Sequence, residues 1–185
     1  MKTRRPLILT ARIAEKDLET FDRLRRAHFP PARNFLRAHL TVFHRLPGEY
    51  SERIVASLER AAGGFDALTA EVTGLQHLGG GVAYSIDCPA LQDIRTMLRA
   101  EFVSWLGPQD MQKWQPHITI QNKVPKAKAD HLYHELTQGF RAHDIEITGL
   151  DLWEYLGGPW RHSTFALFQH ALGKNRASRG DVVRP

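Results

Sequence analysis

The chain has 185 residues, of which 42% are hydrophobic and 24% charged, values that fit one compact domain with a buried core. The single cysteine, Cys88, excludes an internal disulfide, and no apolar run is long enough to span a bilayer, so we expect a soluble, cytoplasmic protein. The net charge of +5 comes from the two ends, because residues 6–172 sum to about −1, which argues against a broad nucleic-acid-binding face and marks residues 173–185 as a disordered basic tail.

Hydrophobic periodicity predicts helices and strands that alternate along the chain. The first half has the pattern of strands at 6–13, 38–46 and 66–74, with helices at 15–28 and 51–61. The second half has the pattern of strands at 82–87, 115–123 and 143–149, with helices at 90–103 and 127–138. Two closing strands are predicted at 151–156 and 163–169. The predicted order βαβαβ therefore occurs twice in the chain, once in each half.

Two pairs of similar segments support an internal duplication. Residues 39–47, HLTVFHRLP, match residues 117–125, HITIQNKVP, at a distance of 78 residues. Residues 65–75, FDALTAEVTGL, match residues 140–150, FRAHDIEITGL, at a distance of 75 residues. A nearly constant offset is typical of a duplicated unit. We therefore predict an α+β fold in which residues 1–172 form one bilobed domain. Its lobes come from repeats at about 6–76 and 82–169, and two mainly antiparallel sheets with outer helices surround a central cleft.

Strand alternation assigns the side chains of the two nine-residue segments to faces. In the first segment one face carries His39, Thr41, Phe43 and Arg45. The other face carries the apolar residues and His44, which we interpret as a packed or edge histidine. In the second segment His117, Thr119, Gln121 and Lys123 share a face. If a pseudo-twofold axis relates the lobes, two histidines and two threonines meet in the cleft.

Two imidazoles and two hydroxyls suit phosphodiester chemistry. Histidine can accept or donate a proton near neutral pH, so one imidazole can serve as base and the other as acid. Threonine hydroxyls held on rigid strands can donate hydrogen bonds to the phosphoryl oxygens. Neither a metal ion nor another cofactor is needed. The alternative is structural, namely that matched hydrogen bonds at the lobe interface preserve the two triplets.

The paired motifs HLTV (39–42) and HITI (117–120), one in each half of a duplicated α+β chain, resemble the two-histidine (2H) phosphoesterase superfamily. The most similar branch is the bacterial 2′-5′ RNA ligase-like and RNA 2′,3′-cyclic phosphodiesterase group. The resemblance implies that His39 is the proton donor, that His117 is the proton acceptor, and that Thr41 and Thr119 hold the phosphate. It implies hydrolysis of 2′,3′-cyclic phosphate RNA ends or of related cyclic or 2′-5′-linked nucleotides.

Two other activities remain open beside hydrolysis. The same site could join RNA ends in the ligase direction, and a non-catalytic module could bind RNA ends or nucleotides in the same cleft. The expected partners are RNA ends or small nucleotides, with no membrane, and we expect a monomer.

Further candidates for substrate binding lie near the end of the chain. In LGGPWRHSTF (156–165) a turn presents Trp160 and Arg161, which suit a base and a phosphate, although a hairpin that only covers the core fits equally well. Tyr155 and Phe43 are added as possible base contacts. His131 and His134 share a helix face but lack a third ligand, so no metal site is predicted.

Overall fold

The computed structural model of the protein describes residues 5–169. Its strands are β1 (Leu7–Ile13), β2 (Leu40–Leu46), β3 (Leu68–His77), β4 (Val82–Asp87), β5 (His117–Gln121), β6 (His143–Tyr155) and β7 (Trp160–Leu167). Its α-helices are α1 (Glu15–His28), α2 (Ser51–Ala62), α3 (Pro89–Phe102), α4 (Pro108–Met111) and α5 (Lys126–Gly139). Short 3-10 turns occupy Pro31–Arg33, Gly48–Tyr50 and Val103–Trp105. The predicted tail, 173–185, lies outside the described residues.

All strand pairs are antiparallel, and the predicted α+β class is confirmed. The strand order is β1-β2-β5-β4-β3-β6-β7, and β1 also pairs with β6. One four-stranded layer is therefore β2-β1-β6-β7 and the other is β5-β4-β3-β6, with the long strand β6 in both. The two layers also touch where β2 meets β5, at the single pair Leu40 and Ile118.

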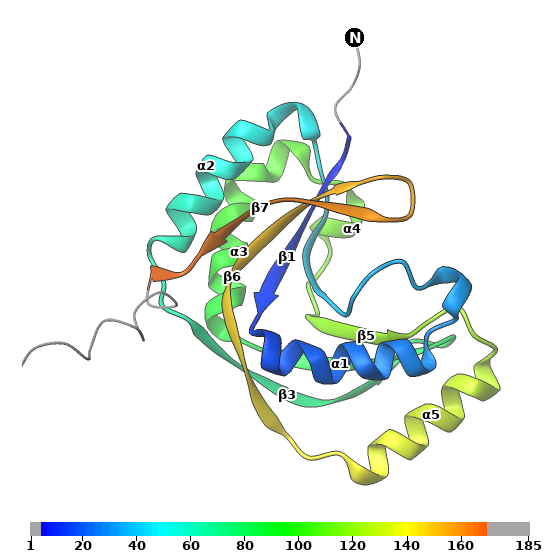
Figure 1. The fold of residues 1–185 in the computed structure, drawn as a ribbon. Helices are drawn as coiled ribbons and strands as arrows, with labels where there is room; N and C mark the ends of the chain where they lie inside the picture. Colours follow the sequence, from blue (N-terminus) through cyan, green and yellow to red (C-terminus); the bar gives the residue numbers. More distant parts are fainter. Residues whose placement is uncertain (1–4, 170–185) are drawn as a thin grey trace, which may run out of the picture.

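The two halves of the sequence exchange strands. The sequence predicts one lobe for each repeat, but β3 of the first half pairs with β4 and β6 of the second, while β1 and β2 share a layer with β6 and β7. The helices are exchanged as well, because α1 packs on β5 and α2 packs on β7. Figure 1 shows α2 and α3 side by side over one layer and α1 and α5 at the other.

Strand β6 is continuous where the sequence predicts a break at residue 150. Its first part, residues 143–147, pairs with β3, and residues 149–155 pair with β7. Gly149 lies inside this strand, and a glycine is needed there because the backbone of the neighbouring strand β7 approaches it closely. A Cβ atom there would lie 2.3 Å from the carbonyl oxygen of Ala166. This glycine therefore permits close strand packing and does not form a turn.

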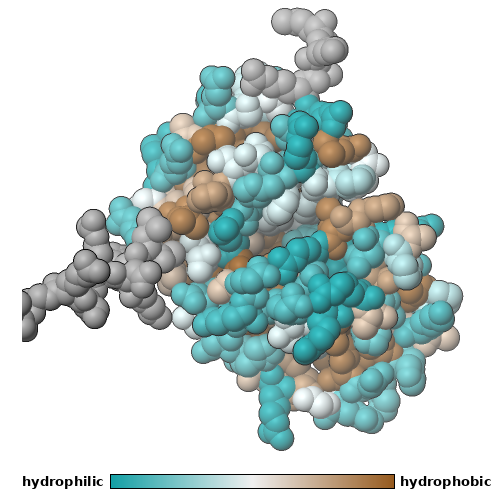
Figure 2. Space-filling model, viewed as in Figure 1, coloured by the Kyte–Doolittle hydropathy of each residue, from teal (hydrophilic) through white to brown (hydrophobic). Residues whose placement is uncertain are grey.

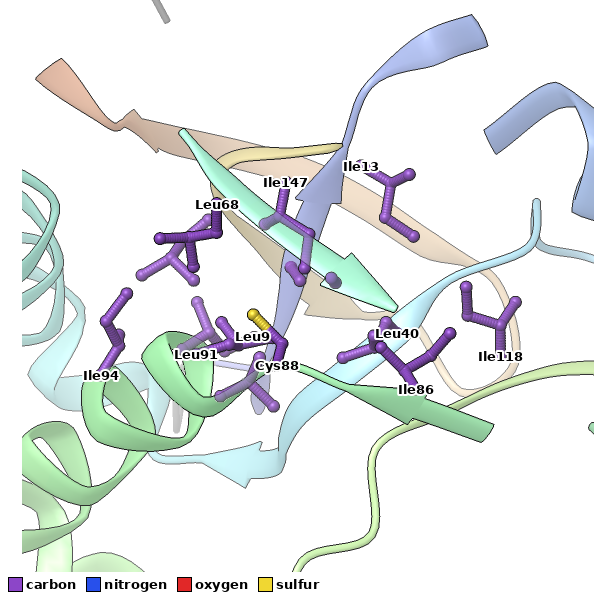
Figure 3. Packing of buried hydrophobic residues seen from close by; sticks show 14 of the residues in the cluster. Leu9, Ile13, Leu40, Leu68, Ile86, Cys88, Leu91, Ile94, Ile118 and Ile147 are labelled. Carbon is purple, nitrogen blue, oxygen red and sulfur yellow. The ribbon is translucent and has the colours of Figure 1, made fainter. Parts of the chain in front are cut away.

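One continuous core joins the two layers and their helices. Figure 3 shows Leu9, Leu40, Leu91 and Ile94 among the side chains that gather between the strands and α3. All four side chains are completely buried. Burial on this scale supplies the main free energy of folding, and it fixes the strands on which the polar residues of the opposite face lie.

The outer helices present a charged surface. Helix α1 has acidic residues in its first turn and basic residues in its last, an arrangement that complements the helix dipole. Figure 2 shows hydrophilic residues gathered over this helix. Within residues 5–169, no helix is long and apolar enough to cross a membrane.

Candidate active site

The two His-x-Thr segments lie on neighbouring antiparallel strands. His39 immediately precedes β2 and His117 begins β5, and the register pairs Leu40 with Ile118. Continuing this register places His39 next to Thr119 and His117 next to Thr41, around a local twofold axis. Leu40 and Ile118 are fully buried, whereas the histidines and threonines are partly exposed on the opposite face.

Each histidine is held by the same hydrogen bond. The Nδ1 atom of His39 lies 2.8 Å from the carbonyl oxygen of Arg37, and that of His117 lies 2.8 Å from the carbonyl oxygen of Gln115. A carbonyl oxygen only accepts, so Nδ1 carries a proton in both rings. The Nε2 atom is then the nitrogen that can exchange a proton with a substrate. The repeat therefore preserves a shared tautomer as well as a shared position.

Two long side chains fix the strands behind the threonines. The Trp114 indole donates a hydrogen bond of 3.0 Å to the carbonyl oxygen of Thr41. Arg25 of α1, which is only 4% exposed, donates one of 2.8 Å to the carbonyl oxygen of Thr119. These bonds hold the strand backbone that carries the two threonine hydroxyls, and donors on a fixed backbone lose little freedom when a ligand binds. Neither Trp114 nor Arg25 is recognised as part of the site by the sequence pattern.

A cleft of about 370 Å³ opens over the two histidines and two threonines of the His-x-Thr segments. Its lining residues are Ile8, His39, Thr41, His44, Gln76, Arg95, Gln109, Gln112, Lys113, Trp114, Gln115, His117, Thr119 and Trp160. Five of them have basic side chains and none has a carboxylate. The cleft therefore favours an anionic ligand.

His39 is the more enclosed of the two histidines. Its ring centroid lies 4.7 Å from that of Trp160, at the start of β7. The pKa of His39 is lowered to about 4, and burial is the largest cause. The hydrogen bond to Arg37 opposes this lowering, and the charges of Arg25, His117 and His44 add to it. His39 is therefore neutral at neutral pH when no anion is bound beside it.

The four residues that sequence reasoning assigns to substrate binding have different positions. Trp160 lines the cleft. Arg161 and Tyr155 are exposed on the β6–β7 hairpin outside the lining residues, and Arg161 pairs with Glu154 at 2.5 Å. Phe43 is completely buried against Phe102, with ring centroids 5.7 Å apart, so its assignment to the cleft is wrong.

A β-bulge explains the error at Phe43. The register between β1 and β2 shifts by one residue between the pairs Thr10–Thr41 and Leu9–Phe43. Strict alternation ends there, and Val42 and Phe43 are both fully buried. His44 then turns to the cleft, although the sequence places it on the apolar side. A third histidine five residues after His39 could have suggested that His44 also belongs to the site. The bulge that turns it to the cleft, however, leaves no clear signal in a single sequence.

Within the described range 5–169, no group of three or more histidine, cysteine, aspartate or glutamate side chains is placed to hold a metal ion. His131, on the exposed face of α5, lies 3.9 Å from Glu135 and is far more than half exposed to solvent. The polar groups that line the cleft include imidazoles, hydroxyls, amides and the cationic side chains of Arg95 and Lys113.

This fold and this pair of imidazoles define a protein of the two-histidine phosphoesterase class. The family model of the 2′-5′ RNA ligase superfamily matches residues 13–159, and the chain belongs to that superfamily. No curated protein is significantly similar to the chain in sequence.

Solved structures share the fold at low sequence identity. TT0787 of Thermus thermophilus superposes with a TM-score of 0.65 at 15% identity, over 88% of this chain and 97% of that one. LigT of E. coli in complex with 3′-AMP gives 0.54 at 17% identity, over 89% and 98%. A structure described as a phosphoesterase gives 0.51 at 20% identity, over 89% and 99%.

Proposed function

We propose that the protein is a cyclic phosphodiesterase that hydrolyses 2′,3′-cyclic phosphate ends of RNA, or related cyclic or 2′-5′-linked nucleotides, without a metal ion. The observation that carries the proposal is the paired arrangement of His39 and His117, each with Nδ1 bonded to a carbonyl and Nε2 left for proton transfer. The carboxylate-free lining of the cleft supports an anionic substrate.

The reaction needs one proton removed and one supplied. His117 accepts a proton from the attacking water through Nε2, and the water oxygen forms a bond to phosphorus. His39 donates a proton to the ribose oxygen whose bond to phosphorus breaks. Thr41 and Thr119 donate hydrogen bonds to the two non-bridging oxygens. The product is a ribose monophosphate with one free hydroxyl.

The low pKa of His39 sets a condition on this assignment. When no anion is bound beside it the ring is neutral at neutral pH, so an acid role requires that the proton be taken up when the substrate binds. A bound phosphate supplies the negative charge that favours the imidazolium. The 3′-AMP found in the LigT complex is a nucleoside monophosphate, the kind of product that such a ring opening gives.

Turnover of a panel of 2′,3′-cyclic nucleotides and cyclic-phosphate oligonucleotides tests the proposal. Chromatography of the products identifies the ester bond that is broken. Thr41→Val and Thr119→Val keep the side-chain shape, remove one donor each, and should lower kcat by about 10-fold to 10³-fold. Tight binding of these ligands without turnover would support a non-catalytic binding module instead.

The ligase direction uses the same residues and the same cleft. It replaces water with the 5′-hydroxyl of a second RNA end. Incubation of a cyclic-phosphate oligonucleotide with a 5′-hydroxyl oligonucleotide separates the two, since a joined product requires the reverse reaction.

A further inference from the structure

The lining of the cleft includes basic side chains that the proposed acid–base chemistry does not use. Besides the two catalytic imidazoles, the lining includes His44 on β2, Arg95 on α3 and Lys113 in the segment before β5. A single phosphate held by two imidazoles and two hydroxyls needs none of these three. They therefore point to a second anionic group on the ligand.

His44 is oriented by a buried carboxylate. Asp110, which is 2% exposed, accepts hydrogen bonds from the backbone N–H of His44 at 2.9 Å, from that of Arg45 at 3.1 Å, and from His44 Nδ1 at 2.9 Å. Burial alone would raise the pKa of Asp110, but these hydrogen bonds outweigh it and the pKa is lowered. The carboxylate is therefore ionised, and Nδ1 of His44 donates to it. Nε2 is the nitrogen left for the cleft, and it donates to an anion there in the imidazolium form, in which both ring nitrogens carry a proton.

Arg95 is a second fixed group among these basic side chains. It is 4% exposed. Its Nε donates a hydrogen bond of 3.1 Å to the carbonyl oxygen of Val42, and its Nη2 donates one of 2.8 Å to the backbone carbonyl oxygen of Asp110. Its guanidinium lies 4.9 Å from the ring centroid of Phe43 and 5.2 Å from that of Trp114. Both hydrogen bonds of Arg95 go to neutral backbone carbonyls. The Asp110 carboxylate interacts with the guanidinium but is itself bonded to His44 and Arg45, so Arg95 still adds positive charge to the cleft that it lines.

The position of His44 relates to the size of a nucleotide. His44 follows Thr41 by three residues on the same strand, which is about 10 Å along an extended chain and less across a bulge. One nucleoside spans a distance of that order. A phosphate at His39 and His117 and a second one near His44 can therefore belong to the same nucleotide or to adjacent ones.

We propose that His44, Arg95 and Lys113 form a second anion subsite, which binds a phosphate one nucleoside away from the reacting one. This inference rests on the proposed function for the identity of the first phosphate. The second phosphate is either the 5′-phosphate of a nucleotide or the internal phosphodiester of an oligonucleotide. A 2′,3′-cyclic mononucleotide without a 5′-phosphate leaves the subsite empty.

Binding experiments test the subsite without turnover. Isothermal titration calorimetry compares adenosine 3′,5′-bisphosphate with 3′-AMP on the unaltered protein, on His44→Gln and on Lys113→Gln. We expect the bisphosphate to bind at least about 10-fold more tightly than the monophosphate, the usual size of a charge-assisted contact. In each variant this ratio should fall towards one. His131→Gln, the same change on the exposed face of α5, should keep the full ratio.

Two results would overturn the subsite. Equal affinity for the two ligands in the unaltered protein would show that no second phosphate is recognised. Equal loss of affinity for both ligands in His44→Gln would place that residue at the reacting phosphate. Lys113 is exposed, so its variant remains informative even if His44→Gln folds poorly.

Turnover distinguishes the failure of this inference from the failure of the proposed function. The substrates are adenosine 2′,3′-cyclic phosphate, its 5′-phosphorylated form, and a dinucleotide with a cyclic end. A higher kcat/KM for the 5′-phosphorylated form identifies a terminal phosphate as the occupant, and a higher value for the dinucleotide alone identifies the internal diester. If no substrate is turned over but the protein still prefers the bisphosphate in a way that depends on His44, the hydrolase proposal is refuted and the subsite stands. If the substrates are turned over but the bisphosphate is not preferred, the subsite is refuted and the hydrolase proposal stands.

Discussion

Replacing Trp160 with alanine should raise the pKa of His39. The indole lies 4.7 Å from the imidazole between ring centroids, and burial is the main cause that holds the pKa of His39 at about 4. Removing the indole admits water to the ring, so the charged form loses less solvation and the pKa moves towards its ordinary value of about 6.5. Trp160 is only half-buried at the edge of β7, and the fold should survive the change.

The difference is large at mildly acidic pH. At pH 5.5 a group with a pKa of about 4 is protonated in about 3% of molecules, whereas a group with a pKa of about 6.5 is protonated in about 90%. The same shift bears on catalysis. The acid limb of the bell-shaped profile of kcat/KM belongs to the coupled imidazole pair, and it should lie near pH 4 in the unaltered protein. It should move upwards in Trp160→Ala.

Nuclear magnetic resonance of the imidazole C–H signals measures this pKa directly. His39→Gln identifies the signal among the ten histidines of the chain. Phe165→Ala, which removes an exposed aromatic ring from the same strand, is the control and should leave the midpoint unchanged. A midpoint near 6.5 in the unaltered protein, or the same midpoint with and without Trp160, would refute the burial argument.

Four further outcomes are expected. His39→Ala and His117→Ala should each lower kcat by about 10²–10⁴. The loss of kcat in the double mutant should be much smaller than the product of the two single losses, because the two groups act in one step. Full turnover in either folded variant would contradict acid–base catalysis. Excess EDTA should leave kcat unchanged, and loss of activity that one divalent metal restores would show that a metal takes part. Gly149→Ala should lower the free energy of unfolding in urea by about 1–3 kcal/mol, whereas Gly74→Ala, where a Cβ meets nothing within 4 Å, should not. Phe43→Ala should cost about 3–5 kcal/mol in the same assay, and a cost under about 1 kcal/mol would mean that the ring is not in the core.

Most of the regular elements could be read from the sequence, because most of them follow a single period over most of their length. The stripe of apolar residues predicts helix 15–28 to the residue, and the observed α1 has the same bounds. The pairing of strands across the two halves could not be read in this way, because periodicity describes a strand's faces and not its neighbours. The sequence predicts two strands that are separated at residue 150, whereas β6 runs through this point with Gly149 packed against the backbone of Ala166.

The centre of the candidate site was accessible to sequence reasoning and its surroundings were not. Two copies of one short motif pointed to His39 and His117, and the structure brings them together on adjacent strands. Asp110 and Arg95 act through contacts with residues more than 50 positions away in the chain, so no local pattern identifies them. The sequence assigned Phe43 and His44 to the wrong faces of the strand, because the bulge shifts the alternation of side chains by one residue.

The exchange of strands between the halves has a consequence during synthesis. Strand β1 leaves the ribosome first, while its partner residues 147–154 in β6 follow about 140 positions later. At ordinary elongation rates that interval is about 10–30 s. During it β1 can pair only with β2, so its other edge is open to pairing with a second nascent chain. Neither half of the chain can close its layers alone, and completion of the fold must wait until β6 has been made.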